Sequence, residues 1–195
     1  MANMTTLAVT EQEYKDIIRT LEHGYTTDLG DGKYIIHRPN HRVAFALRLE
    51  YATGLRVSDI VKLRQKDIVK DGDRYRLDIK EKKTKKKRTS TISKQIYDCI
   101  DSYCAEHNIT SDQKIIGGTT YGIRKQLKYV SEYLGLERVS THSMRKAGAQ
   151  KLLRLSNNNI VAVQTWLNHS SPNTTYTYLA SGNRELEEAL DKMVM

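Results

Sequence analysis

The sequence predicts a mainly α-helical protein with a small antiparallel β-sheet, an α+β fold. Apolar residues recur at helical spacing along most of the 195-residue chain, and the stretch from 67 to 93 changes to a period of two. This length fits one domain with a sizeable core, and neither an internal repeat nor a long linker divides the chain. We therefore expect a single domain over residues 1–195, with its core between about 10 and 180.

Helix starts and breaks organise the first third of the chain. Thr10 and Glu13 make a capping-box pattern, which begins a helix near 11–22. A polar loop rich in glycine is expected to follow and to close at Pro39. A second helix is expected near 40–53, where Gly54 ends it and a further helix begins at Val57.

The sheet and the remaining helices are expected in the rest of the chain. Tyr75, Leu77 and Ile79 alternate with charged residues, and the polar run 80–87 is expected at the tip of a hairpin. Apolar residues recur at helical spacing again after the strand region. This spacing predicts helices near 96–106, 123–134, 142–155, 157–167, around Tyr178 and at about 183–194.

Composition narrows the classes of function. The formal net charge of +9 favours a polyanionic partner, most simply nucleic acid. No run of about 18 apolar residues exists, so neither a transmembrane helix nor a membrane partner is expected. The N-terminus lacks a signal-peptide pattern, so we expect a cytoplasmic protein. Cys99 and Cys104 are expected to be reduced, and no metal site is expected.

Arg56 and Asp59 follow a glycine turn and occupy the first turn of an expected helix. Asp59 lies one helical turn beyond Arg56, where it would orient the guanidinium group. A guanidinium held in this way is suited to binding two phosphate oxygens. Taken alone, however, the pair is more often an ordinary surface ion pair.

A strongly basic run occupies the expected hairpin tip. It would reach a DNA backbone, and the alternative is a solvated turn or a localisation-like patch. One lysine of the run would also be placed to protonate a leaving oxygen. The run comprises Lys80, Lys82, Lys83, Lys85, Lys86, Lys87 and Arg88.

The last third of the chain holds two histidines, an arginine and a tyrosine in an informative order. His142 and Arg145 share one face of a helix, which suits proton transfer together with charge neutralisation at a phosphate. His169 lies nine residues before Tyr178 and follows Asn168, an expected helix C-cap. Each residue alone is more often structural, but the order and spacing together indicate phosphoryl transfer to a tyrosine.

These segments resemble the catalytic domain of the tyrosine recombinases, the phage-integrase family, over about residues 10–180. Ala-Thr-Gly-Leu-Arg56-Val-Ser-Asp59 resembles the first-arginine box of the family. Lys83-Thr84 is similar to its hairpin lysine motif, and His142-Ser-Met-Arg145 resembles its His-x-x-Arg box. The segment from Leu167 to Tyr178, Leu-Asn-His-Ser-Ser-x-x-Thr-Thr-x-x-Tyr, is similar to its most specific box.

The resemblance implies site-specific exchange of double-stranded DNA, with no metal, ATP or other cofactor. Tyr178 would attack a phosphodiester and form a 3′-phosphotyrosine, with His142 as its base and Lys83 as the acid for the departing 5′ oxygen. Arg56 and Arg145 would bind the non-bridging oxygens. His169 would hydrogen-bond the same phosphate, Asp59 would support Arg56, and the DNA backbone would be contacted by Lys82, Lys85, Lys86, Lys87 and Arg88.

One position departs from the family pattern, and two roles have more than one candidate residue. Asn168 replaces the usual glycine, for which it is a suitable substitute at positive φ. Lys82 and Lys85 compete for the acid role, and Tyr176 is a rival nucleophile whose spacing to the histidine is two residues short.

Assembly on DNA as a homo-oligomer, a tetrameric synapse, is expected. The N-terminal core-binding domain of the family is expected to be absent, because few residues precede Thr10. The tail at about 183–194 resembles the helix that family members donate to a neighbouring protomer, and docking on its own core is the alternative. Two other functions remain open, a catalytically inactive DNA-binding regulator and a type IB topoisomerase.

Overall fold

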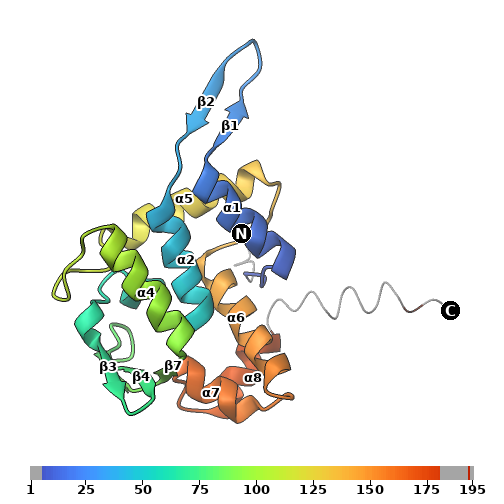
Figure 1. The fold of residues 1–195 in the computed structure, drawn as a ribbon. Helices are drawn as coiled ribbons and strands as arrows, with labels where there is room; N and C mark the ends of the chain where they lie inside the picture. The colour runs from blue at the N-terminus through green and yellow to red at the C-terminus, as the bar shows by residue number, and fades with distance from the viewer. Residues whose placement is uncertain (1–5, 181–192, 194–195) are drawn as a thin grey trace.

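The structure is a computed structural model that describes residues 6–180 and 193. Helix α2 (His41–Thr53) lies at its centre and packs against α1 (Glu11–His23) and α6 (Thr141–Leu155), as Figure 1 shows. The small β-structures lie beside this helical body. The mainly helical fold with small antiparallel sheets that the sequence predicts is confirmed.

Helices α1 and α2 form where the sequence places their caps. Thr10 Oγ1 accepts a hydrogen bond from the Glu13 backbone at 3.2 Å, and the Glu13 carboxylate accepts one from the Thr10 backbone at 2.8 Å. Asn40 caps α2, and Gly54 ends it in the left-handed conformation. The capping box therefore supplies two of the hydrogen bonds that the first turn of a helix otherwise lacks.

A β-hairpin arm replaces the loop expected between these helices. Strands β1 (Tyr25–Asp28) and β2 (Tyr34–His37) pair antiparallel, and the arm projects from the body at the top of Figure 1. Ile35 and Ile36 are 45% and 77% exposed. The expectation of a loop was wrong because the strand signal in a sequence is an alternation of apolar and polar residues, which neither Tyr25–Asp28 nor Tyr34–His37 has.

The predicted strand region forms two small sheets. Strands β3 (Ile68–Asp71), β4 (Arg74–Leu77) and β7 (Thr91–Ile92) make one sheet in the order β3-β4-β7. Strands β5 (Ile79–Lys80) and β6 (Lys87–Arg88) make the other, in which Ile79 lies opposite Arg88. A short helix, α3 (Val57–Ile60), and a 3₁₀ turn (Gln65–Asp67) lead from α2 into the sheets.

The later helices follow the predicted order, and α6 is joined by α4 (Lys94–Glu106), α5 (Thr120–Tyr133), α7 (Ile160–Leu167) and α8 (Pro172–Ala180). Helices α6, α7 and α8 complete one end of the body. Helices α7 and α8 pack against α6 around a second apolar cluster of Ala149, Val163 and Leu167. The helix expected at about 183–194 lies outside the described residues, apart from position 193. Within the described part, no helix is long and apolar enough to span a bilayer.

Candidate active site

Arg56 lies at the start of α3, directly after the turn that Gly54 makes possible. Gly54 has φ +65°, and a Cβ there would lie 2.7 Å from the ring of Trp166, so a larger residue would strain the turn. The Arg56 side chain is 13% exposed, and its Nη1 donates to Glu81 Oε2 at 2.6 Å. One end of the guanidinium is thus held while part of the group still reaches the surface.

Arg145 is buried on α6, with an exposed fraction of 2%. Its Nε donates to the carbonyl oxygen of Gly54 at 2.6 Å and its Nη2 to that of Leu167 at 2.8 Å. Burial lowers the pKa of Arg145, although the nearby Tyr178 acts in the opposite direction. Carbonyl oxygens orient the guanidinium without cancelling its positive charge, which leaves that charge available to an anion.

Tyr178 lies on α8 against Arg145 and His169. The Arg145 Cζ is 5.6 Å from the centre of the Tyr178 ring, and the His169 ring meets that ring edge-on at 5.6 Å. His169 Nδ1 is 3.0 Å from Thr175 Oγ1, which fixes the orientation of its ring. Tyr176 is two residues away on the same helix and is 56% exposed, so it points to a different side.

The protonation states follow from burial and from the two arginines. Burial raises the pKa of Tyr178 to about 12, even though the charge of Arg145 acts in the opposite direction. Burial, together with the charges of Arg145 and Arg56, lowers the pKa of His169 to about 4. Burial and Arg145 also lower the pKa of His142, which lies in the first turn of α6. Near neutral pH the tyrosine is therefore protonated, while both imidazoles are uncharged.

The hairpin β5–β6 carries the exposed lysines next to this site. Asp59 Oδ1 accepts a hydrogen bond from the Lys82 backbone at 2.8 Å, and the Glu81 backbone N–H donates to the Lys86 carbonyl at 3.0 Å. The positive charge of Lys83 is close enough to lower the pKa of His142. The base of the turn is therefore fixed, and the exposed side chains on it are Lys82, Lys83, Lys85, Lys86 and Lys87.

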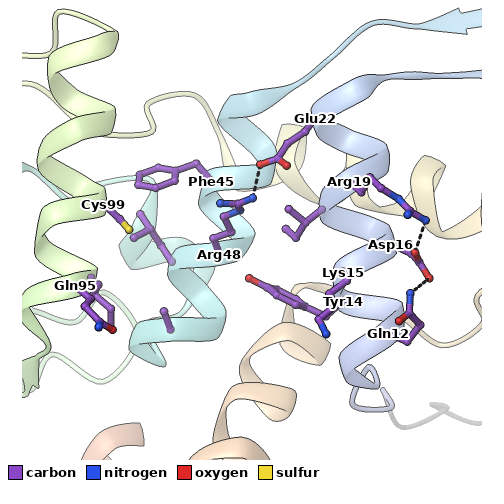
Figure 2. Close-up of a pocket in the computed structure, with 14 residues that line it drawn as sticks. Gln12, Tyr14, Lys15, Asp16, Arg19, Glu22, Phe45, Arg48, Gln95 and Cys99 are labelled. Carbon is purple, nitrogen blue, oxygen red and sulfur yellow. Dashed lines mark hydrogen bonds and ion pairs between the residues drawn. The ribbon is translucent and has the colours of Figure 1, made fainter.

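A separate groove of about 660 Å³ lies between α1, α2 and α4 and contains none of these residues. Figure 2 shows two ion pairs at its rim, Arg48 with Glu22 at 2.6 Å and Arg19 with Asp16 at 2.7 Å. Since both arginines already face carboxylates, this groove does not offer the unneutralised positive charge that Arg145 does.

The fold agrees with comparisons to known proteins. The model of the phage integrase family matches residues 8–185, which is most of the chain. The chain belongs to the phage integrase family. This family assignment confirms the resemblance read from the four sequence boxes, and members of the family are tyrosine recombinases.

Relatives of this integrase-family chain include a Bacillus protein and several solved structures. A probable integrase/recombinase of Bacillus subtilis (strain 168), YoeC, is 28% identical over 155 residues, 75% of this chain and 81% of the relative. The crystal structure of XerA recombinase superposes with a TM-score of 0.66 at 19% identity over 98% of this chain and 65% of that one. A lambda integrase dimer bound to a COC′ core site gives 0.69 at 19% identity over 94% of this chain. This chain spans 51% of the lambda chain.

One residue expected at the DNA surface of this chain is buried instead. Arg88 is 1% exposed. Its Nη2 donates to the carbonyls of Thr53, at 2.7 Å, and of Trp166, while its Nη1 meets Glu81 Oε1 at 3.2 Å. The expectation that Arg88 contacts DNA was wrong, because β6 turns this side chain inward while its neighbours face solvent.

Two acidic residues of the candidate site were missed from the sequence. Glu81 supplies the carboxylate that pairs with Arg56, the part expected of Asp59, which binds the hairpin backbone instead. Glu81 continues the inward alternation of Leu77 and Ile79, and this signal was available in the sequence. Glu50 is fully buried in α2, and burial raises its pKa well above the usual range against the lowering influence of Arg145.

Proposed function

We propose that this chain is a site-specific DNA recombinase that cuts and rejoins double-stranded DNA through a 3′-phosphotyrosine intermediate. The observation that carries the proposal is the gathering of Arg145, from α6, and Tyr178, from α8, under the shared electrostatic influence of Arg56. Membership of the phage integrase family supports it. Two guanidinium groups and a tyrosine around one point are what capture of a phosphodiester by a phenol oxygen requires.

In the proposed mechanism the arginines bind the scissile phosphate. Arg56 and Arg145 donate to its non-bridging oxygens, which gain negative charge as the pentacoordinate transition state forms. His169, uncharged near neutral pH, donates one hydrogen bond to the same phosphate. Because both guanidinium groups are oriented before DNA arrives, little reorganisation is needed during the reaction.

The covalent step exchanges one phosphoester for another. The Tyr178 oxygen forms a bond to phosphorus as the bond from phosphorus to the 5′ oxygen breaks. The phenol proton passes to His142, whose lowered pKa keeps it available as a base. Lys83 donates a proton to the departing 5′ oxygen, and resealing is the reverse of these steps. Phosphoester energy is retained in the phosphotyrosine, so the reaction needs no ATP and, on this proposal, no metal.

Double-stranded DNA is the proposed substrate, and the active form is a homo-oligomer assembled on it, a tetrameric synapse. The net charge of +9 and the lysine-rich hairpin support binding to a polyanion. The lambda integrase to which this chain is similar is a dimer on its core site. We further propose that the segment at about 183–194 is exchanged between protomers, and that the protein acts in the cytoplasm. Removal of residues after 182 would then weaken assembly on DNA without removing cleavage by single protomers.

A covalent-trapping assay tests the function. The probe is duplex DNA from the junctions of the genetic element that encodes the chain, with a nick close to the cleavage site. Cleavage releases a short fragment that carries the free 5′ hydroxyl, and loss of this fragment prevents resealing. The expected result is a protein–DNA adduct that survives denaturation, disappears in Tyr178→Phe and persists in Tyr176→Phe. Absence of any adduct would favour a DNA-binding regulator. Relaxation of supercoiled DNA without exchange between two sites on a plasmid would favour a type IB topoisomerase.

A further inference from the structure

Glu81 is a buried carboxylate at the centre of the positively charged site. Its exposed fraction is 1%. Oε2 accepts from Arg56 Nη1 at 2.6 Å and from Thr84 Oγ1 at 2.8 Å, and Oε1 meets Arg88 Nη1 at 3.2 Å. Both carboxylate oxygens therefore have fixed partners, and two of these partners are guanidinium groups.

The carboxylate is ionised despite its burial. Burial alone would raise the pKa of Glu81, but the hydrogen bond from Thr84 and the charge of Arg56 hold it below its usual value. A buried charge of this kind is tolerated only when it is paired and hydrogen-bonded, and removing one partner is costly. The ion pair of Glu81 with Arg56 thus forms a stable connection between α3 and the β5–β6 hairpin.

Backbone carbonyls anchor this connection on its other side. Arg88 is held by the carbonyl oxygens of Thr53 and Trp166, which lie at the C-terminal ends of α2 and α7. The Gly54 carbonyl accepts from Arg145 Nε at 2.6 Å and from Arg88 Nη1 at 3.4 Å. Arg145 is therefore oriented directly by the backbone, whereas Arg56 is oriented through Glu81, which is in turn held by Arg88.

We propose that Glu81 is a positioning residue for DNA cleavage, which holds Arg56 by Nη1 so that the rest of its guanidinium faces the scissile phosphate. This inference rests on the proposed function. Since the carboxylate adds a negative charge near the phosphate, it does not assist binding of DNA. Its contribution is to the cleavage step, in which a misplaced Arg56 would stabilise the transition state poorly.

The decisive variant is Glu81→Gln, which keeps the size of the side chain and removes its charge. The matched control is Asp78→Asn, which neutralises a carboxylate of the same hairpin region that pairs with the exposed Lys87 at 3.1 Å. A second variant, Thr84→Val, removes one hydrogen bond to Oε2 and leaves the charge. Single-turnover adduct formation on the nicked substrate and the dissociation constant for the same DNA are measured separately, below the melting temperature of every variant.

Glu81→Gln is expected to form the adduct about 10- to 100-fold more slowly, with DNA affinity equal to or tighter than that of the original chain. Thr84→Val is expected to slow the reaction a few fold, and Asp78→Asn to leave it unchanged. Adduct formation by Glu81→Gln within about twofold of the original rate would overturn the proposal. So would a loss of DNA affinity as large as the loss of rate, because that result would indicate a purely structural role.

A measurement without DNA separates this proposal from the proposed function. In the free protein, rotation of the Arg56 guanidinium about its Nε–Cζ bond is followed by ¹⁵N NMR. Slow rotation that becomes fast in Glu81→Gln, while Arg145 stays slow, supports positioning by Glu81. Equal rotation rates of Arg56 in the two proteins would overturn it. If the original chain formed no adduct, the proposed function would fail, and this comparison would still decide the part played by Glu81.

Discussion

Replacing Arg88 by methionine tests whether the buried end of the basic run is structural. Methionine has similar length and no charge, so the substitution removes the ion pair with Glu81 and the hydrogen bonds to three backbone carbonyls. Burial lowers the pKa of Arg88 to about 10, which still leaves the guanidinium charged at neutral pH. Arg88→Met therefore leaves a buried carboxylate with one of its two guanidinium partners missing.

The size of the effect follows from this burial. Arg88 and Glu81 are both 1% exposed, and breaking a buried pair by removing one partner costs about 3–5 kcal/mol of unfolding free energy. For a chain of this length, each kcal/mol lowers the melting temperature by about 2–4 °C. We expect Arg88→Met to lower the melting temperature by roughly 6–20 °C, multiplying these two ranges.

The assay compares Arg88→Met with Lys86→Met, a neutralisation two residues earlier at an exposed position. Thermal unfolding gives the stability of each variant, and the salt dependence of DNA binding counts phosphate contacts. Lys86→Met is expected to leave the melting temperature unchanged and to reduce the slope of log affinity against log salt by about 0.9. If Arg88→Met instead kept the melting temperature and reduced the salt slope by about 0.9, as loss of one phosphate contact would, the assignment of Arg88 to the interior would be refuted.

Three further outcomes are expected. Neutralising Lys85, Lys86 and Lys87 together should weaken binding to all DNA sequences alike and reduce the slope of log affinity against log salt by up to about 3. DNA titrations at several salt concentrations measure this slope. A sequence-selective loss of affinity would contradict contact with phosphates alone. His169 has a pKa of about 4 in the folded protein against 6.5 for a free side chain, so its contribution to stability is complete above pH 6.5 and is lost as the pH falls toward 4. The unfolding free energy of His169→Asn, measured in urea, should therefore depend less on pH in this range than that of the original chain. An unchanged pH dependence would exclude the effect. Gly148→Ala would place a Cβ 2.1 Å from the Tyr51 carbonyl oxygen, so it should destabilise the protein by about 1–3 kcal/mol. The control, Gly122→Ala, should not, because its Cβ meets Thr119 Oγ1 at 3.5 Å. Equal melting temperatures of the two variants would show that α2 and α6 can separate.

Much of the fold and of the candidate site was predictable because the signals are local. The capping box at Thr10 and the left-handed turn at Gly54 depend on residues only a few positions apart, and the structure has both. The family was predictable from the order and spacing of its boxes. Arg145 and Tyr178 come together in the fold, while the chemical role of each residue stays a prediction.

Features that depend on which side chains face one another were decided only by the tertiary structure. Nothing in the composition of the basic run distinguishes Arg88 from the lysines before it; its burial depends on carbonyls at the ends of α2 and α7, which are distant in sequence. The pairing of Arg56 with Glu81 rather than Asp59 depends likewise on how the β5–β6 hairpin docks on α3. The sequence by itself determined the family and the residues available for chemistry. Only folding determined which buried charged side chains position these residues, because the cost of burying a charge depends on partners that long-range contacts supply.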